Sequence, residues 1–320
     1  MVASAFISQG YEIKKILAIL QIPTSSWYYK STGGKPGLRS STHTSTLDGK
    51  LISNTEVVEH IEVLLQQDFV DYGYIKVTHW LRQKLRLIIN FKKVYRLMKE
   101  NRLLYHQHKR DRKGKAFIEF RVPKPELPFE HMEIDIKFIW IHAAGRMAYL
   151  LSILDIKTRA ILGWLLQYSI RKDDVIILIQ AVASWYCLPI KVTIRSDNGA
   201  QFEAKIVREY LQEIEIHQEF SHVATPQDNG HIESYHAIIK KAVCNVFEFL
   251  HLEHAWEIIY RFVEFYNLER LHSGIGYNSP NNYFFQLGVP LPAHPLDGAF
   301  FIPKNRKIYL FQFVESSSKK

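Results

Sequence analysis

Three acidic residues have the types and the spacing for shared chemistry: Asp135 in EIDIKFIW, Asp197 in RSDNGAQF and Glu233 in DNGHIESYHAIIK. Asp135 interrupts a segment that alternates with the two-residue period of a β-strand. A carboxylate on the inward side of a central strand is costly unless it is paired or bound to a metal ion. Taken singly, each acid also has a structural explanation, as a satisfied strand acid, an ordinary turn or a surface helix charge. The conjunction of all three therefore carries the prediction.

The other two acids are expected at the ends of regular elements. Asp197 closes a short strand and precedes Asn198 and a glycine, which are a turn signal. This places Asp197 at the carboxyl end of a strand, where open α/β sheets bind ligands. Glu233 comes after an interval of 35 residues and follows a breaker-rich stretch that starts a helix. Lys240, seven positions further along, shares the helix face of Glu233.

Carboxylates in this arrangement favour metal-dependent phosphodiester chemistry. Two Mg²⁺ ions about 3.5–4 Å apart activate the attacking oxygen and stabilise the leaving oxygen of an in-line displacement. Mg²⁺ prefers oxygen ligands and keeps several waters, so few protein carboxylates suffice, and Mn²⁺ can substitute for it. We assign Asp135 as the bridging ligand, with Asp197 and Glu233 each holding one ion. Without metal the charges repel, and at least one pKa should rise. Further residues are expected to hold a DNA phosphate or to orient ligands: Lys240, Asn198 and Asn229.

These segments resemble the DDE integrase core shared by retroviral integrases and bacterial insertion-sequence transposases, in which the 35-residue interval and the later lysine recur. Residues 266–280 are similar to the "YN…R…H" tail of the IS-three family of insertion sequences, which adds Arg270 and His272 as supporting residues. Residues 72–98 look like the helical DNA-binding region that precedes the core in that family. The resemblance spans most of residues 10–285.

The chain departs from the family pattern at two places. Ile134 stands before the first aspartate, where threonine is frequent, and Arg195-Ser196-Asp197-Asn198-Gly199 stands where His-Ser-Asp-Arg-Gly is frequent. Neither departure removes a metal ligand.

The resemblance implies a DNA transposase that cleaves the ends of its element and then uses the freed 3′-OH to attack another phosphodiester, with no covalent enzyme–DNA intermediate. It also implies double-stranded DNA as substrate, at element ends and target, and a homo-oligomer on that DNA. A small upstream helix-turn-helix protein, or a frameshift fusion to it, is the partner that the family suggests. Two alternatives stay open: a ribonuclease-H-like nuclease, and a catalytically inactive DNA-binding remnant or repressor.

The net charge of +9 is concentrated in one stretch. Residues 91–124 hold 12 Lys or Arg and 3 acids, so the rest of the chain is neutral. This pattern indicates a polyanion-binding surface, the alternative being a solvated charged linker. A short basic helix after a tight turn suits the major groove, although contacts with phosphates alone would give affinity without sequence readout. The predicted DNA-binding residues of this helix and of the connector after it are Lys92, Lys93, Arg96, Lys99, Lys109, Arg110, Arg112 and Lys113.

Residues 130–250 predict the order of a mixed sheet. Three strands with short connections must be antiparallel, and two further strands reached by helical crossovers are parallel. Strands are expected at 131–141, 146–155, 159–168, 191–195 and 217–220, and helices at 172–187, 200–215 and 229–249. The predicted fold class is α/β, a ribonuclease-H-like mixed five-stranded sheet flanked by helices, preceded by an all-α helix-turn-helix-type DNA-binding region.

Composition divides the chain further. Residues 31–50 include 12 Ser, Thr or Gly among 20 and are predicted to be a flexible linker, too polar to bury a core. The predicted domains are a small helical segment at 1–30, this linker, a helical DNA-binding domain at 51–105, a basic connector at 106–128, an integrase catalytic core at 129–285 and a C-terminal extension at 286–320.

The overall composition is that of a globular protein. Of 320 residues, 47% are hydrophobic and 23% charged. No apolar run reaches the roughly 20 residues that a membrane span requires, and the first residues lack the pattern of a signal peptide. Cys187 and Cys244 have no metal-type spacing, which excludes a cysteine-based zinc module and fits a reducing cytosol. We therefore expect a cytoplasmic, nucleoid-associated protein.

Overall fold

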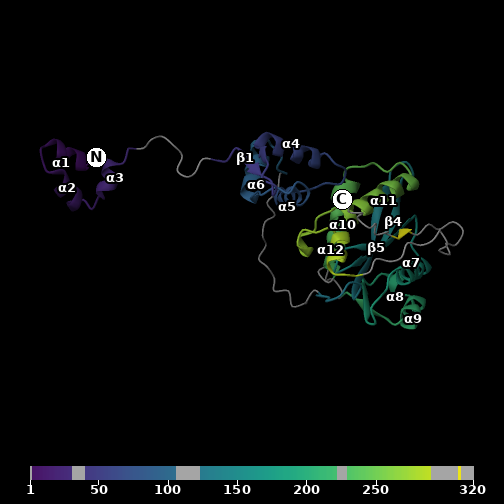
Figure 1. The fold of residues 1–320 in the computed structure, drawn as a ribbon. Helices are drawn as coiled ribbons and strands as arrows, with labels where there is room; N and C mark the ends of the chain where they lie inside the picture. Colours follow the sequence, from purple (N-terminus) through teal and green to yellow (C-terminus); the bar gives the residue numbers. More distant parts are fainter. Residues whose placement is uncertain (1, 31–39, 106–122, 222–228, 290–308, 311–320) are drawn as a thin grey trace. The chain divides into compact units, whose positions relative to one another are not determined.

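The structure is a computed structural model that describes residues 2–30, 40–105, 123–221, 229–289 and 309–310 (Figure 1). The chain forms two units, Met1–Thr42 and His43–Lys320. Part of the predicted basic connector, with Lys109, Arg110, Arg112 and Lys113, lies outside the described residues.

The first unit holds three short helices, as the helical pattern at 1–30 predicts. They are α1 (Val2–Ser8), α2 (Ile13–Ile19) and α3 (Thr24–Tyr28). Within these three helices only Ala3 and Leu17 are buried, so the unit has a very small apolar core.

The second unit begins with a helical domain, residues 43–105. Its elements are β1 (His43–Ser45), β2 (Leu51–Ser53), α4 (Asn54–Leu65), α5 (Tyr74–Lys84) and α6 (Phe91–Glu100). Two helices start at side-chain caps: Ser53 accepts a hydrogen bond from the backbone N–H of Glu56, and Asn90 from that of Lys92. Asn90 is therefore the side-chain cap of α6. Apolar residues from all three helices share one core, which includes Val57, Val77 and Val94, each fully buried.

The end of the predicted linker differs from expectation, because residues 43–45 form β1 and pair antiparallel with β2. The hairpin turn closes between Thr46 and Lys50, with the φ of Gly49 at +82°. Thr44 and Thr46 are only 4% and 8% exposed. The Thr46 hydroxyl can be buried because it bonds the backbone N–H and carbonyl of Lys50, which a count of polar residues does not anticipate.

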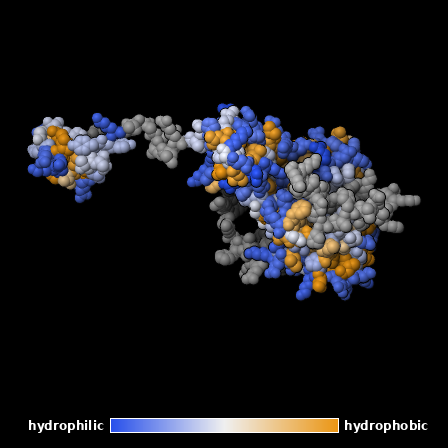
Figure 2. Space-filling view, viewed as in Figure 1, coloured by the Kyte–Doolittle hydropathy of each residue, from blue (hydrophilic) through white to orange (hydrophobic). Residues whose placement is uncertain are grey.

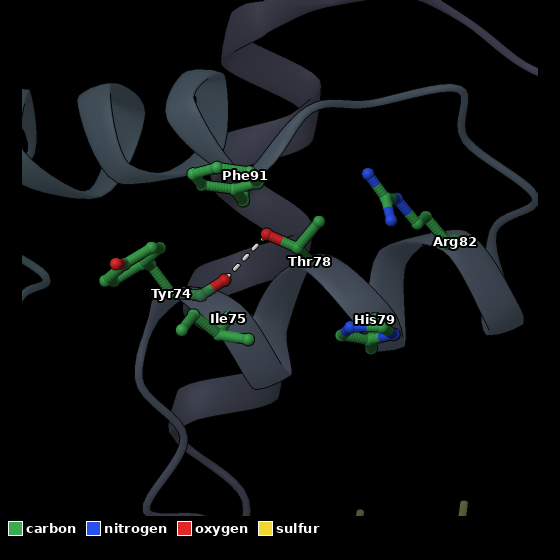
Figure 3. Close-up of a pocket in the computed structure, with 6 residues that line it drawn as sticks. All are labelled: Tyr74, Ile75, Thr78, His79, Arg82 and Phe91. Atoms are coloured by element: carbon green, nitrogen blue, oxygen red, sulfur yellow. Dashed lines mark hydrogen bonds between the residues drawn. The ribbon is translucent and has the colours of Figure 1, made fainter. Parts of the chain in front are cut away.

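A cavity of about 250 Å³ lies between α5 and α6 in the helical domain (Figure 3). Its polar groups are already bonded within the protein: the Thr78 hydroxyl donates to the Tyr74 carbonyl at 2.7 Å, and the Arg82 guanidinium donates to the carbonyl of Ile89. The His79 ring stacks on the Tyr277 ring, with centroids 3.8 Å apart. The cavity is therefore part of the packing of this domain and is separate from the three acids.

The remaining described residues, 123–221, 229–289 and 309–310, form a sheet domain. Its strands are β3 (His131–Ile141), β4 (Arg146–Asp155), β5 (Ile161–Gln167), β6 (Val192–Ser196), β7 (Ile216–Phe220) and β8 (Tyr309–Leu310). The order across the sheet is β7-β6-β3-β4-β5-β8. β3, β4, β5 and β8 pair antiparallel, whereas β6 is parallel to both β3 and β7. The five predicted strands and their mixed pairing are confirmed, and β8 is added at one edge.

Helices cover both faces of this sheet (Figure 1). They are α7 (Lys172–Trp185), α8 (Ala200–Glu203), α9 (Lys205–Glu213), α10 (Gly230–Ile239), a π-helical turn η2 (Lys240–Cys244), α11 (Leu252–Leu268), the 3₁₀ turn η3 (Ser273–Ile275) and α12 (Pro280–Gln286). Right-handed crossovers from β5 to β6 and from β6 to β7 run in the same direction, which puts α7, α8 and α9 on one face. α10 and α11 lie on the other face, where the Trp256 ring of α11 stacks on Trp164 of β5.

Two predicted helices are interrupted. The helix expected at 200–215 breaks at Ala204, whose ψ of 134° is extended. The helix expected at 229–249 is α-helical only to Ile239 and then continues as the π turn η2. Neither break contains proline or glycine, so the sequence pattern carries no signal for it.

The surface is mostly hydrophilic with separate apolar patches (Figure 2). Among the described residues, Phe138, Trp140 and Met147, on the β3–β4 hairpin, are 64%, 44% and 45% exposed. In the part of the chain that was searched, none of the helices has the length and apolar character that crossing a membrane requires.

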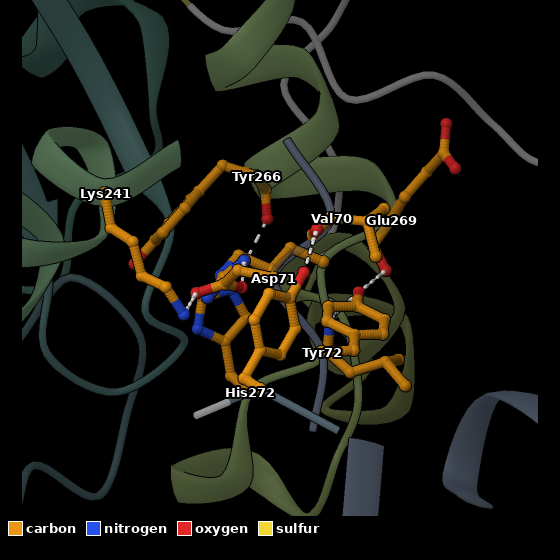
Figure 4. Close-up of polar contacts among 10 residues, drawn as sticks. Val70, Asp71, Tyr72, Lys241, Tyr266, Glu269 and His272 are labelled. Carbon is orange, nitrogen blue, oxygen red and sulfur yellow. Dashed lines mark hydrogen bonds and ion pairs between the residues drawn. The ribbon is translucent and has the colours of Figure 1, made fainter. Parts of the chain in front are cut away.

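A buried polar cluster connects the helical domain to the segment that follows α11 (Figure 4). Arg270 is 2% exposed and pairs through Nη1 with Oδ1 of Asp71. Nζ of Lys241 lies 3.4 Å from the other carboxylate oxygen of Asp71. Burial raises the pKa of Asp71, but the charge and hydrogen bond of Arg270 outweigh burial and hold that pKa below its ordinary value. The Tyr72 hydroxyl accepts the backbone N–H of Leu271 at 2.9 Å.

Arg270 and His272, predicted as supporting residues of the acidic site, are both placed in this cluster. His272 is 9% exposed, and its Nε2 lies 3.4 Å from the carbonyl of Tyr266. Burial lowers the pKa of His272 well below its ordinary value, so the ring is neutral. The end of α11, just before Arg270 and His272, is fixed to β5: the side chain of Asn267 accepts the N–H of Ile161 and donates to its carbonyl.

We predict that Arg270→Ala lowers the free energy of unfolding by about 3–5 kcal/mol, because it leaves the Asp71 carboxylate in the cluster without its main partner. Arg261→Ala is the matched control. Arg261 pairs with Asp68 across the same two domains, but the side chains are 56% and 52% exposed, so the expected loss is about 0–1 kcal/mol. Urea unfolding followed by tryptophan fluorescence measures both values. Equally small losses in both variants would contradict the role of Arg270 as the main partner of Asp71.

Candidate active site

Strand register brings the first two acids together. β3 and β6 pair in parallel from His131 opposite Thr193 to Glu133 opposite Arg195. Continuing this register along both strands places Asp135 beside Asp197. Asp197 directly follows the last residue of β6, and its Oδ1 accepts the N–H of Gly199 at 3.1 Å, which forms the predicted turn.

Glu233 comes from the first turn of α10, which packs on β3. Burial raises the pKa of Asp135 to about 7, and the charges of Asp197 and Glu233 raise it as well. Mutual repulsion, which was expected to raise a pKa in this trio, thus adds to the larger effect of burial. The Asp135 side chain is 20% exposed, whereas Asp197 and Glu233 are exposed. The site is therefore open to solvent on the side of these two residues.

Two neighbours of Asp135 on β3 share its face, since side chains alternate along a strand. Glu133 is fully buried, and its Oε2 accepts the backbone N–H of Ile232 in α10 at 2.6 Å. Burial raises the pKa of Glu133 to about 7. Lys137 lies on the other side of Asp135, and burial lowers its pKa. The sequence interpretation missed both residues, although their two-residue spacing from Asp135 was a usable signal.

His236 is a third residue that the sequence interpretation missed. It follows Glu233 by one helical turn, and its Nδ1 lies 3.4 Å from Oδ2 of Asp135. The side chain is 13% exposed, and burial lowers the pKa of His236 to about 3. The ring is therefore neutral at neutral pH, and its contact with Asp135 is a polar one between a carboxyl group and an uncharged imidazole. The spacing of three residues from Glu233 was the available signal.

The predicted supporting residues have different surroundings. Lys240 is exposed at the start of η2, close enough to Lys137 for its charge to lower the pKa of Lys137. Asn198 is exposed, and its Nδ2 donates to the carbonyl of Ser221 at 3.0 Å. Asn229 directly precedes α10 and is 5% exposed, and its Oδ1 has no hydrogen-bond partner among the described residues.

The four predicted basic residues of α6 are not equivalent. Lys92 and Lys99 are exposed. Nζ of Lys93 donates to the carbonyl of His43 at 2.7 Å, and Arg96 forms an ion pair with Glu100 at 3.2 Å. Lys92 and Lys99 are thus the members of this set that are best placed to contact a phosphate backbone.

Comparison with known proteins agrees with this arrangement. Residues 125–226 match a family model described as an integrase core domain, residues 214–280 match a second model with the same description, and residues 53–111 match a model described as an HTH-like domain. The last of these matches includes α4, α5 and α6.

Curated relatives cover most of the chain. The transposase for insertion sequence element IS904 from Lactococcus lactis is 25% identical over 70% of this chain and 92% of that protein. Transposase InsD for insertion element IS2 from Escherichia coli is 24% identical, over 89% of this chain and 94% of that protein. Among solved structures, the catalytic core of HTLV-2 integrase in complex with magnesium is 16% identical, with a TM-score of 0.39, and covers 50% of this chain and 99% of that one.

The family models and the transposase relatives confirm the predicted resemblance, with an HTH-like domain followed by an integrase core. The chain therefore carries an HTH-like domain followed by an integrase core domain, and it is similar over most of its length to transposases of insertion sequences.

Proposed function

We propose that this chain cleaves the ends of a DNA element and joins the freed 3′-OH to target DNA, using divalent metal ions held by Asp135, Asp197 and Glu233. The observation that carries the proposal is the pairing of β3 with β6 beneath α10, which surrounds Asp135 with two further carboxylates. The HTH-like domain before the core favours this activity over a plain nuclease, for which a sequence-reading domain is unnecessary.

The residues present fit hard divalent cations. All three side chains offer carboxylate oxygens, the donors that Mg²⁺ prefers. Burial and, in addition, the charges of Asp197 and Glu233 raise the pKa of Asp135. A cation would remove the repulsion between these carboxylates. Among the described residues, no group of three or more acidic, histidine or cysteine side chains stands close enough to hold an ion as it is.

When bound, two Mg²⁺ ions would activate the attacking oxygen and stabilise the leaving oxygen. Asp135, Asp197 and Glu233 would hold these ions, and Mn²⁺ would substitute. His236 limits the orientation of Asp135 through its contact with Oδ2. Lys240 and Lys137 supply positive charge beside the acids for a DNA phosphate, and Asn198 and Asn229 lie next to Asp197 and at the start of α10, where they would orient ligands or DNA.

The substrate we propose is double-stranded DNA at the element ends and at the target, bound in part by the exposed face of α6. We also propose that the chain acts as a homo-oligomer on DNA in the cytoplasm, at the nucleoid. An upstream small helix-turn-helix protein, or its frameshift fusion, is the proposed partner for end recognition.

Asp197→Asn and Glu233→Gln are each predicted to lower the rates of 3′-end cleavage and joining by roughly 10³-fold, because losing a metal ligand forfeits several kcal/mol of transition-state stabilisation. Labelled end DNA incubated with Mg²⁺ measures both steps. Asp173→Asn, an exposed acid on α7, is the control and should retain wild-type rates. Joining at the normal rate by Asp197→Asn would refute the proposal. If the wild-type protein cleaved RNA–DNA hybrids without preference for element ends, a ribonuclease-H-like nuclease would be favoured. If it bound DNA but neither cleaved nor joined it, an inactive DNA-binding remnant would be favoured.

Mg²⁺ is predicted to raise the melting temperature of the wild-type protein and not that of Asp135→Asn. An ion present at about 100 times its dissociation constant adds about 2.7 kcal/mol of stability. Without metal, the Asn variant should be the more stable protein at neutral pH, because folding raises the pKa of Asp135 from 3.8 to about 7; the wild-type protein therefore loses stability as pH rises from 3.8, and the loss is complete above about 7. Thermal melts with EDTA and with Mg²⁺ test this. Equal Mg²⁺ shifts in both proteins would exclude Asp135 as a ligand.

Lys92→Ala and Lys99→Ala are each predicted to reduce the slope of log affinity for DNA against log salt by about 0.9, since each would remove one phosphate contact. Lys93→Ala serves as the comparison on the same helix, and a smaller change is expected because its Nζ already bonds the His43 carbonyl. Titrations of labelled duplex at several salt concentrations give the slopes. Unchanged slopes for Lys92 and Lys99 would show that this face of α6 does not contact DNA.

A further inference from the structure

The start of α10 decides where Glu233 lies, because Glu233 is in the first turn of that helix. A helix leaves its first backbone N–H groups without partners inside the helix. The residue before α10, Asn229, makes no side-chain capping hydrogen bond. Something else must therefore satisfy and fix this end of the helix.

Glu133 supplies the missing acceptor from another element. Its Oε2 accepts the N–H of Ile232 at 2.6 Å, and the N–H of His231 also donates to this carboxylate. A capping side chain normally comes from the residue directly before the helix and bonds the same early N–H groups. Here the cap comes from β3, which also carries Asp135 two positions further along.

The burial of Glu133 argues for a role beyond packing. The side chain is 0% exposed, and its Oε1 has no hydrogen-bond partner among the described residues. The nearby charges of Arg195 and Arg159 favour its carboxylate form, yet Arg195 is already paired with Glu219 at 2.8 Å. An apolar side chain at this position would avoid the cost of burying a carboxylate, but it could not bond the N–H of Ile232.

We infer that Glu133 is a positioning residue: its carboxylate fixes the first turn of α10 to β3 and thereby sets Glu233 against Asp135. The inference rests on the proposed function, since it concerns the same pair of metal-holding acids. It adds that the distance between these acids is governed by a third carboxylate that touches neither metal nor DNA.

Three substitutions separate the hydrogen bond from general packing. Glu133→Gln keeps an oxygen acceptor at the same reach. Glu133→Asp keeps the charge but is one methylene shorter and cannot bring its carboxylate to the N–H of Ile232 without a backbone shift. Glu133→Ala removes the acceptor. Ser53→Ala is the matched control, because it removes a side-chain cap of the same kind from α4 in the helical domain.

The first measurement is hydrogen–deuterium exchange of residues 229–239 in the metal-free protein. Glu133→Ala and Glu133→Asp should speed exchange in this segment by at least about 10-fold, whereas Glu133→Gln and Ser53→Ala should leave it near wild type. The second is the affinity for Mg²⁺ by calorimetry, which should fall by about 10- to 100-fold in the same two variants and be largely retained in Glu133→Gln.

The outcomes are distinguishable. Wild-type exchange at residues 229–239 in both Glu133→Ala and Glu133→Asp would overturn the inference. So would a loss in Glu133→Gln equal to that in Glu133→Ala, because burial of charge would then matter and the bond would not. If the exchange result is as expected while the wild-type protein binds no Mg²⁺ and cleaves no DNA, the clamp by Glu133 stands and the proposed function fails.

Discussion

Strand β3 carries two carboxylates on one face, and the cost of burying them shapes the surroundings of this strand. Glu133 is fully buried, and the Asp135 side chain is 20% exposed. Burial is the largest cause that raises the pKa of each to about 7. An apolar sheet would avoid this cost, so the neighbouring elements have to offset it. Backbone N–H groups at the start of α10 do so for Glu133, whereas His236 and the backbone of Ile136 contact Asp135.

The same constraint explains how the acidic site stays open. Asp197 and Glu233 bring further negative charge towards Asp135 from β6 and α10. Three carboxylates cannot be packed closely without a counter-charge. Two of them, Asp197 and Glu233, are exposed to solvent. The charges that do approach, on Lys137 and Lys240, come from beyond Asp135 along β3 and from η2. The fold thus keeps a local excess of negative charge around Asp135, with the positive charges of Lys137 and Lys240 beside it.

The sequence was sufficient for the features that depend on local periodicity. Alternation placed β3 and β4 at their observed bounds, and turn residues located Asp197 at the end of β6. Features that depend on tertiary contact were not readable. In the sequence, Glu133 is one more polar position of an alternating strand; only the structure shows that the start of α10 bonds to it. Arg270 was grouped with the acidic site through its motif, although its partner Asp71 lies in the helical domain, 199 residues away in the chain.

The helix formed by α10 and η2 is where these two regions meet. Glu233 and His236, in its first turns, face the acids on the sheet, whereas Lys241, in η2, pairs with Asp71 of the helical domain. An uninterrupted α-helix would keep the regular spacing of 3.6 residues per turn between these positions. The π turn that begins at Lys240 changes this spacing and ends the helix. Lys240 is the residue at this change of geometry, between the acids and the Asp71–Arg270 cluster. One continuous helical segment thus carries Glu233 of the acidic site at its start and, at its end, Lys241, which contacts Asp71 of the helical domain.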